Sequence, residues 1–266
     1  MKLKTAHPMI RFWHYVSEFL ATFIFFFVGS MMIGIFFGLP AFKESFLTQE
    51  MRILAVVMVI IATTLLIIYS PLGKISGAHM NPAVSFAFWM EAHLETIDFI
   101  FYVLVQILAT LAAIYLVSII IPDPSIATKL GLPEPPSEHR VFIEFAAEVF
   151  ATGILIGLLF FFLSEKILVK YTGALMGCYI FFIKLISIEA VSLNLNPAKY
   201  LGAATVFHHF SNAWLYIIGP FLGTFLAVML HRSWSILKRP KYFRFNHEEG
   251  YLEKLFSRYS DLKKKK

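Results

Sequence analysis

Two short apolar runs, each opened by Asn-Pro-Ala, constrain the fold of this chain more than any other feature. The first run begins at Asn81 and stops at Glu91, and the second begins at Asn196 and stops near Phe207. Asparagine is a favoured N-cap residue and proline suits the first helical position, so each tripeptide predicts the start of a helix. Each run is far shorter than the roughly 20 residues that a bilayer-spanning helix needs. We therefore expect two half-helices that enter a membrane and end inside it.

The composition is that of an integral membrane protein. The chain has 266 residues, of which 58% are hydrophobic and only 15% are charged, whereas a soluble domain has about 25% charged residues. Its single cysteine, Cys178, permits no internal disulfide and is expected to be a small buried thiol. Six longer apolar runs are predicted to span the membrane: 19–39, 53–72, 99–121, 145–163, 171–188 and 212–230.

The two halves of the chain share a pattern that predicts an internal repeat. The segment Glu18-Phe-Leu-Ala-Thr22 opens the first predicted span, and Glu148-Val-Phe-Ala-Thr152 opens the fourth. Each is followed by two further spans with an Asn-Pro-Ala half-helix between them. Because three spans per half is an odd number, the two repeats must be inverted in the membrane. Inverted repeats with broken helices place those helices at the midplane, along a polar pathway.

This arrangement would bring Asn81 and Asn196 together at mid-membrane. Both half-helix N-termini would point at that place, and each carries about half a positive charge. Such a field opposes a cation or hydronium but not a neutral hydrogen-bonding molecule. Irregular backbone before each asparagine can persist at this depth only where it lines a wet pathway. Its carbonyl oxygens would then accept hydrogen bonds from water or polyols.

From Glu18 to Leu230 the sequence resembles the aquaporin family, the major intrinsic proteins. The resemblance implies an all-α membrane fold of six transmembrane helices plus two re-entrant half-helices, with a pore in every subunit and a homotetrameric assembly. It rests on the repeated Glu-x-x-x-Thr pattern, on Ser76-Gly77-Ala78-His79, and on the two tripeptides Asn81, Pro82, Ala83 and Asn196, Pro197, Ala198.

The resemblance also implies roles for three residues near the half-helices. Glu18 and Glu148 would accept hydrogen bonds from the buried half-helix loops, although intramembrane acids could instead relay protons. His79 would be a structural loop residue, with gating by protonation as the alternative.

The outer selectivity filter is where this sequence departs from the family. The matching positions are Ile61, Lys184, Leu193 and Lys199. Water-selective members usually have an aromatic residue, a histidine, a small residue and an arginine there. Lysine is a flexible point charge and not a planar fork like arginine, and two ammonium groups at one constriction would repel. The missing aromatic residue widens such a filter while two long lysines narrow it.

We therefore expect a passive channel for water and/or small neutral solutes that excludes cations and protons. The alternatives are a channel for glycerol, urea or small organic acids and, in a different class, a proton-coupled secondary transporter. The sequence has no pattern typical of an enzyme, a metal site or a cofactor site. Its expected partners are a small uncharged solute and the lipid bilayer of a cell or inner membrane, not nucleic acid.

Basic residues set the predicted domain limits and orientation. Six spans would place residues 1–11, the turn with Lys166 and Lys170, and the tail on one side, which the positive-inside rule makes cytoplasmic. The predicted parts are a basic N-terminus at 1–11, a channel domain at 12–235 and a basic tail at 236–266. Within the channel domain we expect one repeat at about 12–121, a loop at 122–140 and a second repeat at about 141–235.

Overall fold

The computed structural model describes residues 8–43, 48–122, 138–187 and 193–238, and within these ranges the protein is helical with no strand. The long helices are α1 (Pro8–Ile33), extended by the π-helical turn η1 (Gly34–Gly38), α3 (Gln49–Tyr69), α6 (Thr96–Ile120), α7 (Val141–Ser164) and α10 (Ala213–Lys238). The shorter elements are α2 (Pro40–Lys43), α4 (Pro71–Ser76), α5 (Pro82–Met90), η3 (Glu138–Arg140), η4 (Val169–Tyr171), α8 (Thr172–Ser187) and α9 (Pro197–Val206).

Within the described ranges, five helices are long and apolar enough to cross a membrane, and the described part of the sixth predicted span is shorter. The five stretches are Met9–Gly38, Gln49–Tyr69, Thr96–Ile120, Val141–Ser164 and Ala213–Trp234. Of the run predicted at 171–188, residues 172–187 form α8, a helix of 16 described residues, and Ile188 lies outside the described part of the chain. At 1.5 Å per residue α8 is about 24 Å long, somewhat less than the roughly 30 Å of a hydrocarbon core. The all-α class with two half-helices is confirmed.

Two expectations about single residues were wrong. Glu18 does not stand at the entrance to the first span, because α1 begins at Pro8 and Glu18 lies fully buried inside the helix. The predicted span began after Arg11 and Glu18 because hydropathy treats charged residues as unfavourable in a membrane. In the fold, both side chains are hydrogen-bonded to groups that are distant in sequence. Cys178 is exposed and not buried; its neighbour Gly177 is the residue that faces α3.

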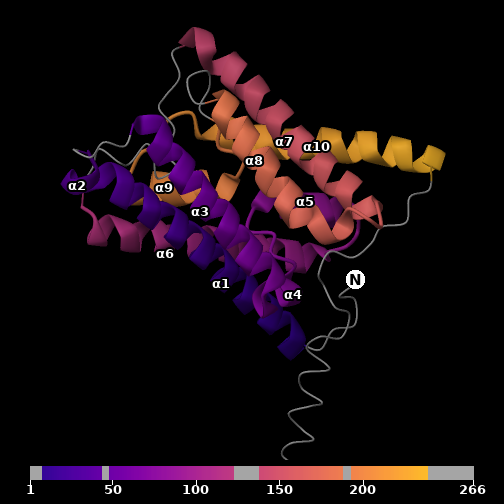
Figure 1. Ribbon diagram of the computed structural model, residues 1–266. Coiled ribbons are helices and arrows are strands. Elements are labelled where there is room, and N and C mark those ends of the chain that lie inside the picture. The colour runs from indigo at the N-terminus through magenta and orange to yellow at the C-terminus, as the bar shows by residue number, and fades with distance from the viewer. Residues whose placement is uncertain (1–7, 44–47, 123–137, 188–192, 239–266) are drawn as a thin grey trace, which may run out of the picture.

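The long helices form two pairs that match the two sequence repeats. α1 packs along α6, and α7 packs along α10, while α5 and α9 lie among these long helices and touch one another (Figure 1). Small residues permit the close α7–α10 approach. A Cβ placed on Gly153 would lie 3.3 Å from the Gly223 carbonyl oxygen, and one on Gly219 would lie 2.9 Å from Cβ of Glu148.

The half-helices begin at the residues that the sequence predicted. Asn81 precedes α5 with extended backbone, and its Oδ1 accepts a hydrogen bond from the Ala83 N–H at 2.9 Å. Asn196 does the same for α9, accepting from the Ala198 N–H at 3.1 Å. Proline follows each asparagine at the first helical position, where no N–H is needed. The two helices have 9 and 10 residues, so neither is long enough to cross a bilayer.

Candidate functional site

The tips of the two half-helices are joined by a reciprocal pair of hydrogen bonds. Asn81 Nδ2 donates to the carbonyl oxygen of Leu195, and Asn196 Nδ2 donates to that of Met80, both at 2.9 Å. Each asparagine therefore caps its own helix through Oδ1 and holds the opposite loop through Nδ2. A side-chain amide has two N–H donors, so each asparagine keeps one donor that no described residue uses. The remaining tripeptide residues (Pro82, Ala83, Pro197 and Ala198) are buried around this junction.

The backbone before each asparagine is held in the left-handed region. Gly77, Ala78 and Met80 have φ of 89°, 49° and 50°, and Leu195 has φ of 61°. A non-glycine residue in this region costs about 1 kcal/mol or more, and it persists only where the surroundings impose it. Within the described residues, no group donates a hydrogen bond to the carbonyl oxygens of Gly77 or Ala78. The first loop thus presents partly exposed polar backbone directly before the buried Met80 and Asn81.

Glu18 holds the first loop from inside α1. Its Oε1 accepts hydrogen bonds from the Met80 N–H at 2.6 Å and from Gln106 Nε2 at 2.7 Å. Its Oε2 accepts from the His79 N–H at 3.3 Å. The side chain is fully buried, and a buried carboxylate is tolerated only where its oxygens are hydrogen-bonded. Glu18 therefore couples α1, α6 and the loop before α5.

Glu148 holds the second loop in the same way from inside α7. One of its oxygens accepts a hydrogen bond from the Asn194 N–H, and the other accepts from the Leu195 N–H at 3.0 Å. It too is fully buried. The equivalent placement of Glu18 and Glu148 explains why the glutamate of the repeated pattern occurs once in each half. The two left-handed loops are fixed by backbone-to-carboxylate bonds from opposite sides of the junction.

His79 is held on three sides. Its Nδ1 lies 3.1 Å from Ser85 Oγ, and its ring stacks on Phe88 with 4.6 Å between ring centroids. The ring of Tyr102 packs beside it at 5.2 Å. Its backbone N–H is the one that Glu18 accepts. These contacts agree with a loop residue fixed in place.

The four filter positions belong to α3, to α8, to the segment just before α9 and to α9 itself. Ile61 on α3 packs toward α8, where a Cβ on Gly177 would lie 3.1 Å from its Cγ2. Leu193 is buried in a cluster with Ala151 and Leu195. Lys199 is partly exposed in the first turn of α9. Lys184 belongs to α8, but its side chain lies outside the described residues.

Three polar residues at this site were not anticipated from the sequence, namely Ser85, Tyr102 and Gln106. Gln106 on α6 donates to Glu18 and also to Ser85 Oγ, the latter at 2.9 Å. Tyr102, one turn earlier on α6, donates its hydroxyl to the Ser76 carbonyl oxygen at 2.7 Å. A glutamine in the middle of an uncharged span was the available signal, since buried polar groups require partners. Within the described part of the chain, no group of three or more His, Cys, Asp or Glu side chains could hold a metal ion.

Inverted repeats with paired half-helices define a class of membrane proteins that carry a polar pathway through each chain. The sequence profile described as Major intrinsic protein matches residues 7–231, so the chain belongs to the major intrinsic protein family. Members of this family are channels for water or small solutes.

Individual relatives cover most of the chain. Aquaporin-1 of Bos taurus is 26% identical over an alignment of 251 residues that covers 90% of this chain and 91% of that protein. Aquaporin-2 of Ovis aries is 31% identical over an alignment of 221 residues that covers 81% of this chain and 76% of that protein. The X-ray structure of the aquaglyceroporin from Plasmodium falciparum has the same fold, with a TM-score of 0.61 at 19% identity. It aligns with 83% of this chain and 95% of its own.

Proposed function

We propose that this chain is a passive channel that conducts water or small neutral solutes past the joined tips of α5 and α9. The observation that carries the proposal is the reciprocal pair of bonds from Asn81 and Asn196 to the opposite loop. It places two helix N-termini and two spare amide donors at one buried point. A polar junction at this depth requires a wet pathway beside it, because lipid offers no hydrogen bonds.

Charge at the junction favours neutral solutes. Each helix N-terminus contributes about half a positive charge near its first turn, and α5 and α9 both begin at the junction. A cation or hydronium there is opposed by both helix ends, whereas water is oriented by the amide donors and accepted by loop carbonyls. We infer that cations and protons are excluded at this point.

The hydrogen bonds of the two buried carboxylates argue against a proton-coupled secondary transporter. A coupled transporter needs a carboxylate that gains and loses a proton in the pathway. Both oxygens of Glu18 and of Glu148 accept backbone N–H bonds from the half-helix loops. Protonating either carboxyl group would remove the negative charge that strengthens these hydrogen bonds. We therefore assign both to loop support, together with His79.

We also propose that Ile61, Lys184, Leu193 and Lys199 form the outer constriction. Lys199 is the third residue of α9 and so lies one turn from Asn196. The ammonium group of Lys199 at a constriction would add to the barrier that the helix ends raise against cations. Whether glycerol, urea or a small organic acid passes as well as water depends on the width that these four side chains leave. We further propose cytoplasmic termini and a homotetramer.

Stopped-flow light scattering of reconstituted vesicles tests the proposal. Vesicles that contain the protein should shrink faster under an osmotic gradient than empty vesicles, with a lower activation energy and without any ion gradient. A pH-sensitive dye inside the same vesicles should report no added proton flux. A requirement for a proton gradient, or solute uptake against a concentration gradient, would instead establish the coupled transporter. Glycerol, urea and lactate in the same assay rank the solutes.

A further inference from the structure

A groove on the outer surface, away from the half-helix junction, has the form of an amphiphile site. It has a volume of about 780 Å³ and lies between the end of α5, the start of α6 and the last turns of α10. The volume falls within the roughly 300–1,000 Å³ of typical ligand sites. Its lining residues are Phe86, Trp89, Met90, Ala92, Leu94, Glu95, Thr96, Phe225, Met229 and Arg232.

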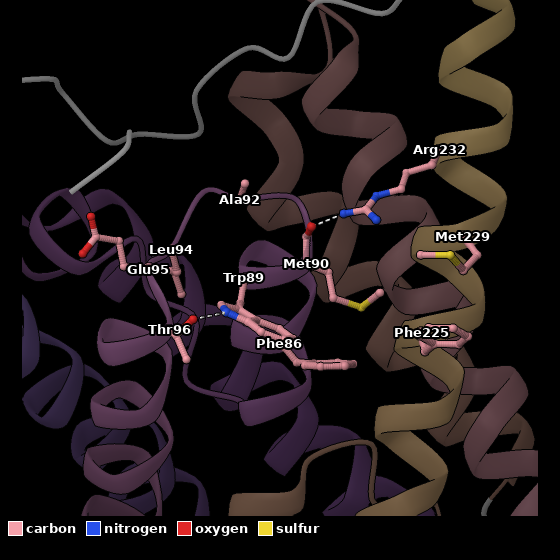
Figure 2. A pocket seen from close by; sticks show the side chains of 10 residues that line it. All are labelled: Phe86, Trp89, Met90, Ala92, Leu94, Glu95, Thr96, Phe225, Met229 and Arg232. Carbon is pink, nitrogen blue, oxygen red and sulfur yellow. Dashed lines mark hydrogen bonds between the residues drawn. The ribbon is translucent and has the colours of Figure 1, made fainter. Parts of the chain in front are cut away.

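The polarity of the groove changes along α10. Phe225, Met229 and Arg232 occupy one face of this helix, and Figure 2 shows Arg232 at one end of the groove and Phe225 with Phe86 at the other. Arg232 comes seven positions after Phe225, which is about 10 Å along the helix axis. The aromatic end is apolar, whereas the other end carries a guanidinium. This gradient matches a molecule with an acyl chain and a charged head.

The groove lies where the membrane boundary is expected. The apolar stretch of α10 ends at Trp234, two positions beyond Arg232, and that of α6 begins at Thr96. The indole of Trp89 donates a hydrogen bond to Thr96 Oγ1 at 3.1 Å. Tryptophan is enriched at the level of lipid head groups. The charged end therefore lies at the head-group level and the aromatic end lies in hydrocarbon.

Arg232 has donors to spare at this end. Its Nε donates to Glu91 at 2.9 Å and its Nη2 donates to the Met90 carbonyl oxygen. A guanidinium has five N–H donors, so the Nη1 group is not engaged by any described residue. The side chain is 46% exposed. Arginine binds phosphate strongly through paired N–H groups. The unengaged Nη1 side of the Arg232 guanidinium is therefore suited to bind a lipid phosphate.

The charges around the mouth nearly cancel. Glu91 balances Arg232, and Glu95 is paired with Arg11 at 2.7 Å. A lipid with a net negative charge would leave this end with an excess negative charge, whereas a zwitterionic lipid would not. We propose that the groove binds one zwitterionic phospholipid, with its phosphate on Arg232 and an acyl chain along Phe86, Phe225 and Met229.

Native mass spectrometry of the delipidated full chain, titrated with phosphatidylcholine in detergent, tests the proposal. The wild type should bind one lipid per chain saturably. Met229→Trp fills the groove and should remove this site. Leu230→Trp, at a 72% exposed neighbour that does not line the groove, should bind as the wild type does. Both variants add an indole to α10, but only Met229→Trp adds it at a residue that lines the groove.

A second pair of variants, each of which removes one positive charge, gives an independent comparison. Arg232→Gln should weaken phosphatidylcholine binding about tenfold, as expected for lost charge-assisted hydrogen bonds, and Lys166→Gln, at an exposed loop lysine, should not change it. Equal binding within either pair of variants would overturn the site. Phosphatidylglycerol that binds tenfold more tightly than phosphatidylcholine would overturn the choice of a zwitterionic head group. Thermal unfolding of each variant identifies any that fails to fold, and the other pair then decides.

Discussion

Replacing Gly223 with alanine is expected to destabilise the protein by about 3 kcal/mol, because its added methyl group has no room. A Cβ at this position of α10 would overlap the carbonyl oxygen of Val149 and lie 3.0 Å from the Gly153 nitrogen. Both are backbone atoms of α7, so they cannot rotate away as a side chain would. The two helices would have to separate along their whole interface, which includes the region of Glu148.

Gly157→Ala is the matched control on α7. A Cβ on Gly157 meets nothing within 4 Å, and alanine is favoured over glycine in a helix interior by about 1 kcal/mol. Its thermal unfolding temperature in detergent should equal or exceed that of the wild type, while that of Gly223→Ala should fall clearly. Similar unfolding temperatures for the two variants would show that α7 and α10 do not pack backbone to backbone.

Glu148→Gln is expected to cost about 3 kcal/mol and to lower solute flux, although the two side chains have nearly the same shape. The carboxylate accepts one loop N–H on each oxygen, from Asn194 and Leu195. Glutamine offers only one oxygen, and its NH₂ would face the other N–H donor. A buried donor left without an acceptor costs about 1–3 kcal/mol, and the lost charge adds to this. The same argument applies to Glu18→Gln, where His79, Met80 and Gln106 are the donors.

Glu144→Gln provides the control, one helical turn earlier on α7. Glu144 is also buried, but among the described residues it accepts a hydrogen bond only from the Tyr216 hydroxyl, at 3.0 Å. Glutamine keeps an oxygen for that bond, so we expect a change below about 1 kcal/mol. Thermal unfolding and vesicle permeability at matched protein density check all three variants. If Glu18→Gln and Glu148→Gln fold as stably as Glu144→Gln and only the pH dependence of transport changes, these carboxyl groups relay protons.

The half-helices were predictable because their signals are local. Asn81 and Asn196 each cap a helix whose proline and apolar run follow directly in sequence, and both caps are present in the fold. The repeated Glu-x-x-x-Thr pattern likewise anticipated that Glu18 and Glu148 hold equivalent positions. Repetition within one chain provided a comparison that a single motif could not.

Other features depended on contacts that a linear pattern does not contain. The start of α1 was placed too late because hydropathy counts Arg11 and Glu18 as unfavourable, whatever partners they have. Arg11 pairs with Glu95 across the bundle at 2.7 Å. Gln106 was overlooked because nothing in the sequence joins it to Glu18, which is 88 positions away. The filter positions came from motif spacing, which gives a register but not the packing of Leu193 against Ala151.

A thiol-block experiment at Lys199 tests most directly whether solutes pass beside the joined half-helices. The chain has a single cysteine, so Cys178→Ser provides a background in which Lys199→Cys is the only thiol. A methanethiosulfonate reagent should reduce the osmotic water permeability of its vesicles to that of empty vesicles, and a reducing thiol should restore it. Leu230→Cys, on the exposed face of α10, should be labelled without effect. Undiminished water flux through fully labelled Lys199→Cys would contradict a pathway at this junction.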